Sequence, residues 1–448
     1  MISRNFKNVL VVSLGFLSLF TAYGGLQGLQ SSLNAEQGMG VASLSVVYAS
    51  IIISSMFLPP ILIKNLGCKW TIVAGMACYV SYSFGNLFPG WYTLIPTSVI
   101  LGLGGSPMWS AKCTYLTISG NMQAAKDGKK GSDVINQYFG IFFFIFQSSA
   151  VWGNLMSSLI FGQDSNIAHI PEEQLLSCGA ADCGLNISMN STIIKPAQKL
   201  VWTLVGCYIG VGVLAILIVA VFLDNIDQEQ TSEFRGNREP FRQTFLATFR
   251  LLKDWRLVTL IPLTMYSGFE QSFLSGEYTK NYTTCALGIH YVGFVMMCFG
   301  AANSVCSFLF GRIARYTGRA ALFFLAAACN FCCIIGLLYW RPHPEQLPTQ
   351  TNALYGVLFP REKEAAFANY RMWESLGFVI AFAYSTFICL EYKLYILLAV
   401  LVLTVITYPI VEYNEHKSPT PPIEKGTYTS HRDVIKKVEN AIICQTPM

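Results

Sequence analysis

Residues 8–29 read NVLVVSLGFLSLFTAYGGLQGL, a stretch with no charged side chain. A helix of about 20 apolar residues is long enough to cross the hydrocarbon core of a bilayer. Because backbone polar groups find no water there, a crossing segment is expected to be helical. We interpret residues 8–29 as a retained first transmembrane helix, with a cleavable signal peptide as the alternative.

Ten further stretches of this kind follow, so eleven spans are predicted. Their approximate limits are 41–63, 70–88, 91–110, 136–161, 200–223, 257–276, 289–310, 320–340, 367–390 and 393–412. Charged residues make up 12% of the chain, against about 25% in a typical globular protein. The sequence therefore predicts an all-α polytopic membrane protein, and it excludes a secreted disulfide scaffold and an ordinary cytosolic enzyme.

The basic residues predict the orientation, because Lys and Arg favour cytoplasmic loops. They occupy every second connection, at Lys64 and Lys69, at 126–130, at 235–256 and at 312–319. The N-terminus is therefore expected in the cytoplasm and the loop 163–199 outside. That loop carries two sequons, Asn186-Ile-Ser and Asn190-Ser-Thr, which we predict to be glycosylated.

Two cysteines of the exterior loop are candidates for a disulfide. Cys178 and Cys183 lie five positions apart in an oxidising compartment, so a local bond between them is expected, while nearby Cys285 leaves the pairing open. No metal or other cofactor is expected, since no cluster of ligand residues is recognised.

The two halves of the chain repeat one another, as is common in transporter folds. Span one contains Tyr23-Gly-Gly-Leu-Gln27, and the span at 257–276 contains Tyr266-Ser-Gly-Phe-Glu270. Each half also has a short turn that combines glycine, which permits positive φ, with a basic residue suited to lipid headgroups. The residues of these turns are Gly67 and Lys69 in the first half, and Gly311, Gly318 and Arg319 in the second.

The turn GRIARYTGR at 311–319 resembles the loop signature of the major facilitator superfamily, whose twelve helices form two six-helix bundles. Three further strings are similar to the Unc-93 branch of that superfamily. They are GLGGSPMWSAKCTYLT at 102–117, NQYFGIFFFIFQSSAVWGN at 136–154 and FANYRMWESLGF at 367–378. The match runs from residue 1 to about 415. The resemblance implies a major-facilitator-like fold and a role as an accessory subunit of a two-pore potassium channel or as an escort of receptors.

One helix of the implied twelve is missing from the count. Only residues 341–360 remain to cross the membrane as span ten. They contain several prolines and polar residues, which disqualify them as a transmembrane helix. We predict an N-terminal bundle at 1–223, a cytoplasmic linker at 224–256 and a C-terminal bundle at 257–412 that lacks most of span ten. Residues 413–448 are predicted to be a disordered tail.

Glu270 is the best functional candidate, because an acid inside an apolar span costs about 2.5–3.5 kcal/mol and usually faces a cavity. With its neighbour Gln271 and its repeat counterpart Gln27, it forms a candidate cavity at mid-depth. The alternative is that these side chains only hold helices together. Glu277 lies nearer the exterior boundary and is predicted to be solvated.

Two further charged positions are interpreted structurally. Lys112 is expected to snorkel to the cytoplasmic interface. Arg371 and Glu374 lie three positions apart, which permits an ion pair within one helix.

Two functions from different classes follow. Lys64 and Arg315 stand where transporters of the resembling superfamily usually carry an acid, which favours a regulatory or escort subunit of a potassium channel or receptor in the plasma membrane. The alternative is a secondary active transporter of a small solute that the sequence does not identify. The chain is expected to contact the lipid bilayer and not nucleic acid. We do not expect it to be an enzyme or to bind a cofactor. Because span ten is short, we expect retention in the endoplasmic reticulum.

Overall fold

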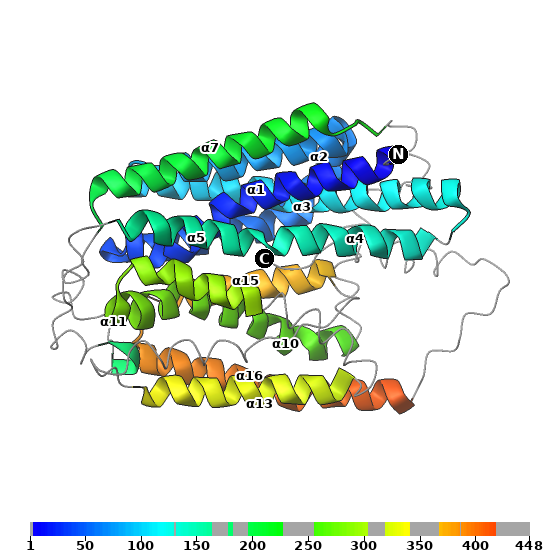
Figure 1. The fold of residues 1–448 in the computed structure, drawn as a ribbon. Helices are drawn as coiled ribbons and strands as arrows, with labels where there is room; N and C mark the ends of the chain where they lie inside the picture. The colour runs from blue at the N-terminus through cyan, green and yellow to red at the C-terminus, as the bar shows by residue number, and fades with distance from the viewer. Residues whose placement is uncertain are drawn as a thin grey trace.

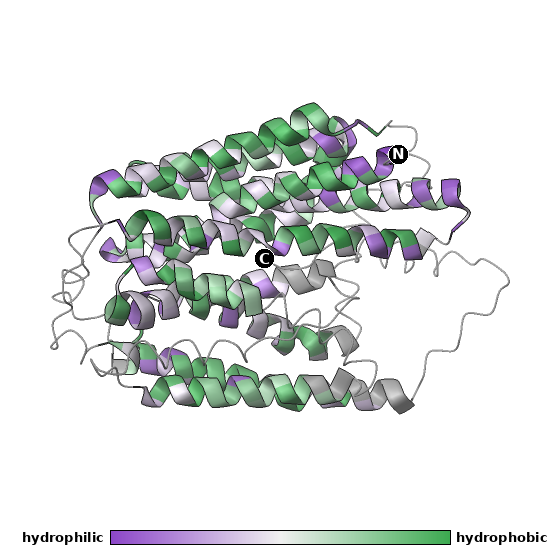
Figure 2. Ribbon diagram, in the orientation of Figure 1, coloured by the Kyte–Doolittle hydropathy of each residue, from purple (hydrophilic) through white to green (hydrophobic). Residues whose placement is uncertain are grey.

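A computed structural model of the chain describes residues 3–129, 131–163, 178–181, 196–226, 255–302, 319–340, 367–385 and 387–417. Within these ranges every regular element is helical. The helices of the N-terminal half lie together on one side and those of the C-terminal half on the other (Figure 1). Hydrophilic residues gather toward the helix ends, and hydrophobic ones follow the helix lengths, as expected of membrane spans (Figure 2).

In its described residues, the N-terminal half contains six helical segments of 13 to 47 residues, some of which join two predicted spans or divide one. They are α1 (Arg4–Leu33), α2 (Met39–Gly85), α3 (Trp91–Asp127), α4 (Gly131–Gln147), α5 (Ser149–Phe161) and α7 (Gln198–Phe222). The short 3-10 helices η1 (Glu36–Gly38) and η2 (Gly179–Ala181) belong to this half of the sequence.

The C-terminal half contains α10 (Trp255–Ser272), the π-helix η3 (Phe273–Thr284), α11 (Cys285–Leu287), a helix over His290–Ala302, α13 (Arg319–Tyr339), α15 (Phe367–Tyr384) and α16 (Leu390–Lys417). Each of the eleven predicted spans therefore coincides with a helix in the described part of the chain. Five of the described helices are long and apolar enough to cross a membrane by length and composition.

The turn at Gly67 reverses the chain within α2. Gly67 has a φ of +74°, which a residue with a side chain adopts at a cost. On either side of the turn, Ser43 and Tyr82 share a hydrogen bond of 3.0 Å, so the two arms of α2 run antiparallel. The structure places Gly67 at this turn; Gly311, Gly318 and Arg315 lie outside the described residues, and Arg319 begins α13.

Two helices of the C-terminal half end on the same side of the molecule, which we call the predicted exterior end because Cys178 lies there. Near the end of α13, the Leu337 carbonyl accepts a 2.9 Å hydrogen bond from Tyr282 of η3. The α15 helix runs alongside α10 and η3, since Glu374 contacts Gln271 and Ser385 contacts Glu277.

Trp340 and Phe367 consequently lie at opposite ends of the bundle. The residues between them, with the predicted short span ten, lie outside the described part of the chain, as does the predicted disordered tail from 418 onward.

An aromatic core holds the N-terminal half together. Phe20 of α1 packs edge-on against Trp109 of α3 and Phe146 of α4, with ring centroids 5.3 and 5.1 Å apart. Tyr23 packs against Tyr79 of α2 at 4.9 Å. Such pairs add about 0.5–1.5 kcal/mol each beyond the burial of their area. This half is therefore fixed by packing of its own rings.

Away from the exterior end, Asp224 ties the first helix to the end of α7. Its carboxylate accepts from the Arg4 guanidinium at 2.8 Å and lies 3.3 Å from the Lys7 ammonium. The hydrogen bond from Arg4, followed by that from Lys7, lowers the pKa of the Asp224 carboxyl below its usual value. This contact is exposed, and it closes the N-terminal half at the predicted cytoplasmic end.

Candidate functional site

The two halves meet along a seam whose first part joins α1 to the π-helix η3. Ser31 shares a 3.1 Å hydrogen bond with Thr279, and Ser32 shares one of 2.8 Å with Thr284. All four residues are buried. These hydroxyl pairs hold the two halves together close to the predicted exterior end.

The second part of the seam is an aromatic stack between α2 and α15. The rings of Tyr48 and Phe378 are parallel, with centroids 4.0 Å apart, and Phe382 follows at 6.1 Å from Tyr48. Gln27 of α1 donates a 3.0 Å hydrogen bond to the Tyr48 hydroxyl. The Gln27 amide, predicted to face a cavity, is thus bonded to Tyr48, whose ring stacks on Phe378 of the other half.

The third part joins α5 to the helix His290–Ala302. Ser158 donates a 2.7 Å hydrogen bond to the His290 carbonyl. A Cβ on Gly293 would lie 2.2 Å from the Asn154 carbonyl oxygen, so only glycine permits this approach. These three contact regions all lie in the part of the molecule nearer the predicted exterior end, which they close.

Glu270 and Gln271 contact their own half of the molecule. Gln271 donates to Ser267 and to Glu374, each at 3.2 Å. Glu270 lies on the same helix as Tyr266 and interacts electrostatically with it and with Cys333 of α13. Gln27 thus bonds to Tyr48 of α2, while Gln271 bonds to Ser267 of α10 and Glu374 of α15.

Glu374 links two helices in the structure. It is almost fully buried and accepts from Ser267 of α10 at 3.1 Å as well as from Gln271. The side chain of Arg371, the ion-pair partner predicted for it, lies outside the described part. The bonds to α10 explain why an acid is found at this depth, since they tie α15 to α10.

Glu277 corrects a prediction: it is buried, with 6% of its surface exposed, and not solvated. Its carboxylate lies 2.9 Å from the ammonium of Lys393, which is 4% exposed, and it also accepts from Asn281 at 2.9 Å and from Ser385. Lys393 donates in addition to the Ser385 carbonyl at 2.6 Å. Glu277 can be buried because α16 begins beside η3 and supplies the opposite charge, that of Lys393.

Sequence reasoning missed Lys393, although a signal was present. It is a basic residue at the start of a span whose first end is predicted to lie outside, where the positive-inside rule disfavours it. A charge in the wrong place of this kind indicates a buried partner. The same network engages the side-chain amide of Asn281. Asn281-Tyr-Thr is also a glycosylation sequon, and a glycan on this amide would displace the bond to Glu277.

Lys112 corrects a second prediction, because it does not snorkel to the interface. Its side chain is fully buried, and its ammonium lies 4.3 Å from the ring centroid of Phe142, 4.8 Å from Trp109, 4.9 Å from Phe143 and 5.5 Å from Phe139. All four distances are within the range of cation–π attraction. The rings of α3 and α4 form an aromatic box around it.

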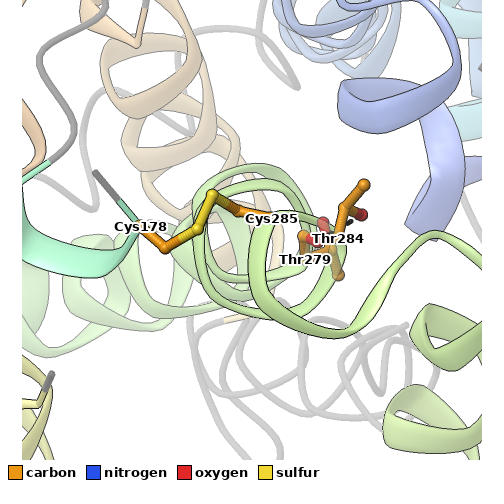
Figure 3. The surroundings of a disulfide bond; sticks show 4 residues. All are labelled: Cys178, Thr279, Thr284 and Cys285. Carbon is orange, nitrogen blue, oxygen red and sulfur yellow. Dashed lines mark hydrogen bonds between the residues drawn. A yellow bond between two sulfur atoms is a disulfide. The ribbon is translucent and has the colours of Figure 1, made fainter. Parts of the chain in front are cut away.

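The disulfide of the exterior segment also differs from the expected local bond. Cys178 is bonded to Cys285 and not to Cys183, with the two Cα atoms 5.7 Å apart. The physical reason is that η2 packs on the C-terminal half, where Gly179 meets Trp340, so Cys178 arrives beside the end of η3 (Figure 3). Cys389 is disulfide-bonded as well.

The two lysines of the first-half turn lie near the surface. The Lys69 ammonium is 5.4 Å from the centroid of the Trp70 ring, and Lys64 is exposed. Asn186 and Asn190 lie outside the described residues, as does Cys183.

Comparison with solved structures gives the class of protein. The nucleoside transporter NupG covers 92% of this chain and 100% of its own at a TM-score of 0.60 and 13% identity. The peptide transporter POT in complex with sulfate covers 91% and 94% at a TM-score of 0.55 and 13% identity. At this identity the likeness shows the fold alone. The chain is a multi-pass membrane protein with a major-facilitator-like fold, as predicted.

The chain belongs to the UNC-93 family, which confirms the resemblance of the quoted strings. The family model "Ion channel regulatory protein UNC-93" matches residues 32–346. "Protein unc-93 homolog A" of Danio rerio is 67% identical over the whole of both chains, and that of Homo sapiens is 55% identical over 96% of this chain and 98% of its own. The "Putative potassium channel regulatory protein unc-93" of Caenorhabditis elegans is 33% identical over 92% of this chain and 61% of its own.

The alignment with the Danio rerio relative bears on the length of the chain. It extends over 466 positions, whereas this chain has 448 residues. The relative therefore has about 18 residues that have no counterpart here, close to the length of one membrane span of about 20 residues.

Proposed function

We propose that this protein is a non-enzymatic regulatory subunit of a potassium channel in the plasma membrane. The family description and the printed name of the Caenorhabditis elegans relative support a channel as the partner. A receptor membrane protein is the other partner class that the resemblance implied. The observation that carries the proposal is the Tyr48–Phe378 stack across the seam.

The stack favours regulation over transport for a physical reason. A transporter must part its two halves at each end in turn, so the contacts at a closed end are broken in every cycle. Here parallel rings, buried on both sides, share the seam with the Gln27 amide and with two hydroxyl pairs. Stacked aromatic residues contribute about 0.5–1.5 kcal/mol beyond the area they bury. Such a seam suits a protein that stays closed.

The proposed topology has the N-terminus in the cytoplasm and the segment 163–199 outside, glycosylated at Asn186 and Asn190. The Cys178–Cys285 bond supports this orientation, because disulfides persist in oxidising compartments. Enzymatic removal of N-glycans should lower the apparent mass of the protein, and changing both asparagines to Gln should abolish the shift. An unchanged mass for the parent protein would contradict this topology.

Secondary transport of a small solute is the second candidate, favoured by a specific observation. A Cβ on Gly24 would meet no atom within 4 Å, so α1 has open space beside Gln27 at mid-depth. Glu270, at the equivalent place in the other half, is only half-buried. A titratable group at this depth is suited to ion coupling.

Currents in voltage-clamped cells distinguish the two functions. All forms carry an apolar segment of about 20 residues inserted after Trp340, because the short span ten is expected to prevent surface delivery. The protein is expressed alone, with a two-pore potassium channel, and as Glu270→Gln both with and without the same channel, at matched surface amounts. Regulation predicts that the channel current changes on co-expression and that Glu270→Gln behaves like the parent. Solute-dependent currents in cells without the channel, lost in Glu270→Gln, would favour transport instead.

A further inference from the structure

We propose that the buried Glu277–Lys393 ion pair holds helix η3 in its π-helical form, and that this form seals the predicted exterior end by presenting Thr279 and Thr284 to α1. The pair is a positioning device, since its charged groups bond to η3, α15 and α16, while Thr279 and Thr284 bond to α1. The proposal goes beyond channel regulation and does not depend on the identity of a partner.

The π-helical form is what brings both threonines to α1. Hydrogen bonds from i to i+5 place residues five positions apart on nearly the same face. Thr279 and Thr284 are five apart, the Thr284 hydroxyl donates to the Thr279 carbonyl at 2.8 Å, and the two reach Ser31 and Ser32. In an α-helix five positions turn about 1.4 times, so Thr284 would point about 140° away from Thr279. The Ser32 bond would then be lost.

A π-helix of this length needs support. π-Helical geometry is rare and is found mostly as single-turn bulges, whereas η3 extends over 12 residues. Support is present on the side away from α1. Glu277 of η3 forms an ion pair with Lys393 at the start of α16, and it accepts hydrogen bonds from Ser385 at the end of α15 and from Asn281 of η3.

The burial of this pair makes its effect strong. Removing one partner would leave an uncompensated charge in a place with little solvent, which is strongly unfavourable. The carboxylate can therefore not leave Lys393 without finding another cation. Any return of η3 to α-helical geometry would rotate Glu277 away from α16, so the ion pair opposes that return.

The disulfide anchors the end of the same segment. Cys285 follows η3 directly and is bonded to Cys178 on the side of η3 opposite Thr279 and Thr284 (Figure 3). The segment is thus held by hydroxyls toward α1, by charge toward α16 and by sulfur toward η2. The disulfide lies just beyond η3, whereas the ion pair lies two positions before Thr279, within the turns that set the position of that residue.

The test measures how close α1 and η3 lie when the pair is altered. Ser32 and Thr284, which share one contact, are replaced as S32C/T284C, and a protease site is placed in the 224–256 linker. A short bismaleimide then joins the two introduced thiols. After cleavage, a reducing gel separates the halves unless the thioether bridge joins them, because native disulfides are reduced. The protein without S32C/T284C controls for bridges between native cysteines.

Three backgrounds are compared with the parent, each checked for folding by gel filtration in detergent. K393M removes one charge, E277Q/K393M removes both without leaving a charge unpaired, and E277K/K393E exchanges them. We expect bridging to fall about tenfold in E277Q/K393M, the change that 1.4 kcal/mol produces in an equilibrium. The exchange should restore most of it.

A folded E277Q/K393M protein that bridges as well as the parent would overturn the proposal, and so would a folded exchange variant that fails to recover. If K393M does not fold, the two double variants still decide the question, because neither leaves a lone buried charge.

Discussion

The two halves of the molecule each bury a lysine, and they hold it in different ways. Lys112 in the N-terminal half lies among four aromatic rings of α3 and α4, at 4.3–5.5 Å from their centroids. Lys393 in the C-terminal half lies 2.9 Å from the carboxylate of Glu277.

The difference has a structural consequence. The rings belong to neighbouring helices of one half, so they stabilise a charge without constraining the other half. An ion pair between α16 and η3 fixes the segment that forms the seam. We conclude that the N-terminal half is held by packing and that polar contacts in the C-terminal half set the geometry between the halves.

The largest expected effect concerns the completeness of the C-terminal half. Trp340 and Phe367 lie at opposite ends of the bundle, and the Danio rerio relative has about 18 residues without counterpart here. We predict that the 448-residue chain is retained in the endoplasmic reticulum, and that inserting an apolar segment of about 20 residues after Trp340 restores delivery to the surface.

Surface biotinylation of both forms, with an epitope on the tail probed before and after permeabilisation, checks this prediction. A matched control inserts a polar segment of equal length at the same place. Equal delivery of the original and extended forms would show that a short span ten is tolerated and that the C-terminal half is as complete as the N-terminal one.

The next effect is expected at Lys393. K393M leaves Glu277 buried without its cation, which we expect to destabilise the protein by about 3–5 kcal/mol. E277Q/K393M should be considerably closer to the parent, because no lone charge remains. Thermal unfolding in detergent, followed by loss of the monodisperse peak, measures both. If K393M unfolds at the temperature of the parent, the ion pair does not hold the C-terminal half.

A smaller effect is expected at Lys112. K112M removes a desolvated cation–π attraction of about 2 kcal/mol but gains sulfur–aromatic contacts, so a net loss of about 1 kcal/mol is predicted. K69M is the matched control, since Lys69 also lies over a ring but only half-buried. The same unfolding measurement applies. A loss as large as that of K393M would remove the contrast between the two halves.

The smallest effect is expected at Asp224, whose contacts with Arg4 and Lys7 are largely exposed. D224N should cost about 0.5 kcal/mol at neutral pH and less at high salt. Because the pKa of the folded carboxyl is lowered, the contribution is present above its usual value of 3.8 and is lost as the pH falls through the folded pKa. The difference between D224N and the parent should therefore vanish in acid. A difference that persists there would point to packing and not to charge.

Much of the fold was predictable from the sequence because apolar length alone defines a membrane helix. The eleven spans coincide with described helices for that reason. The reversal at Gly67 was predictable because a glycine two positions before a lysine, Lys69, favours a turn at the headgroups. Both signals are local, and neither requires knowledge of which helices are neighbours.

The seam was not predictable because it depends on contacts between distant residues. Glu277 and Lys393 are far apart in the chain, and the sequence around either residue does not identify the other as its partner. The π-helix escaped prediction because the mixed polar and aromatic sequence of η3, FLSGEYTKNYTT, contains no pattern that distinguishes a π period from an α period. The pairing of Cys178 with Cys285 depends on where η2 packs, which spacing does not encode. Lys112 was misplaced because its rings come from α4 as well as α3.

We propose that the predicted exterior end stays closed while the protein, in the form extended after Trp340, regulates its channel. Y48C/F378C places two thiols across the seam, where a disulfide-forming bifunctional reagent can join them and a reductant release them. The measurement is the potassium current of the co-expressed channel before joining, after joining and after release, with the parent treated in the same way. We predict that regulation of the current is unchanged by joining; a regulatory effect that disappears on joining and returns on release, only in Y48C/F378C, would contradict the claim.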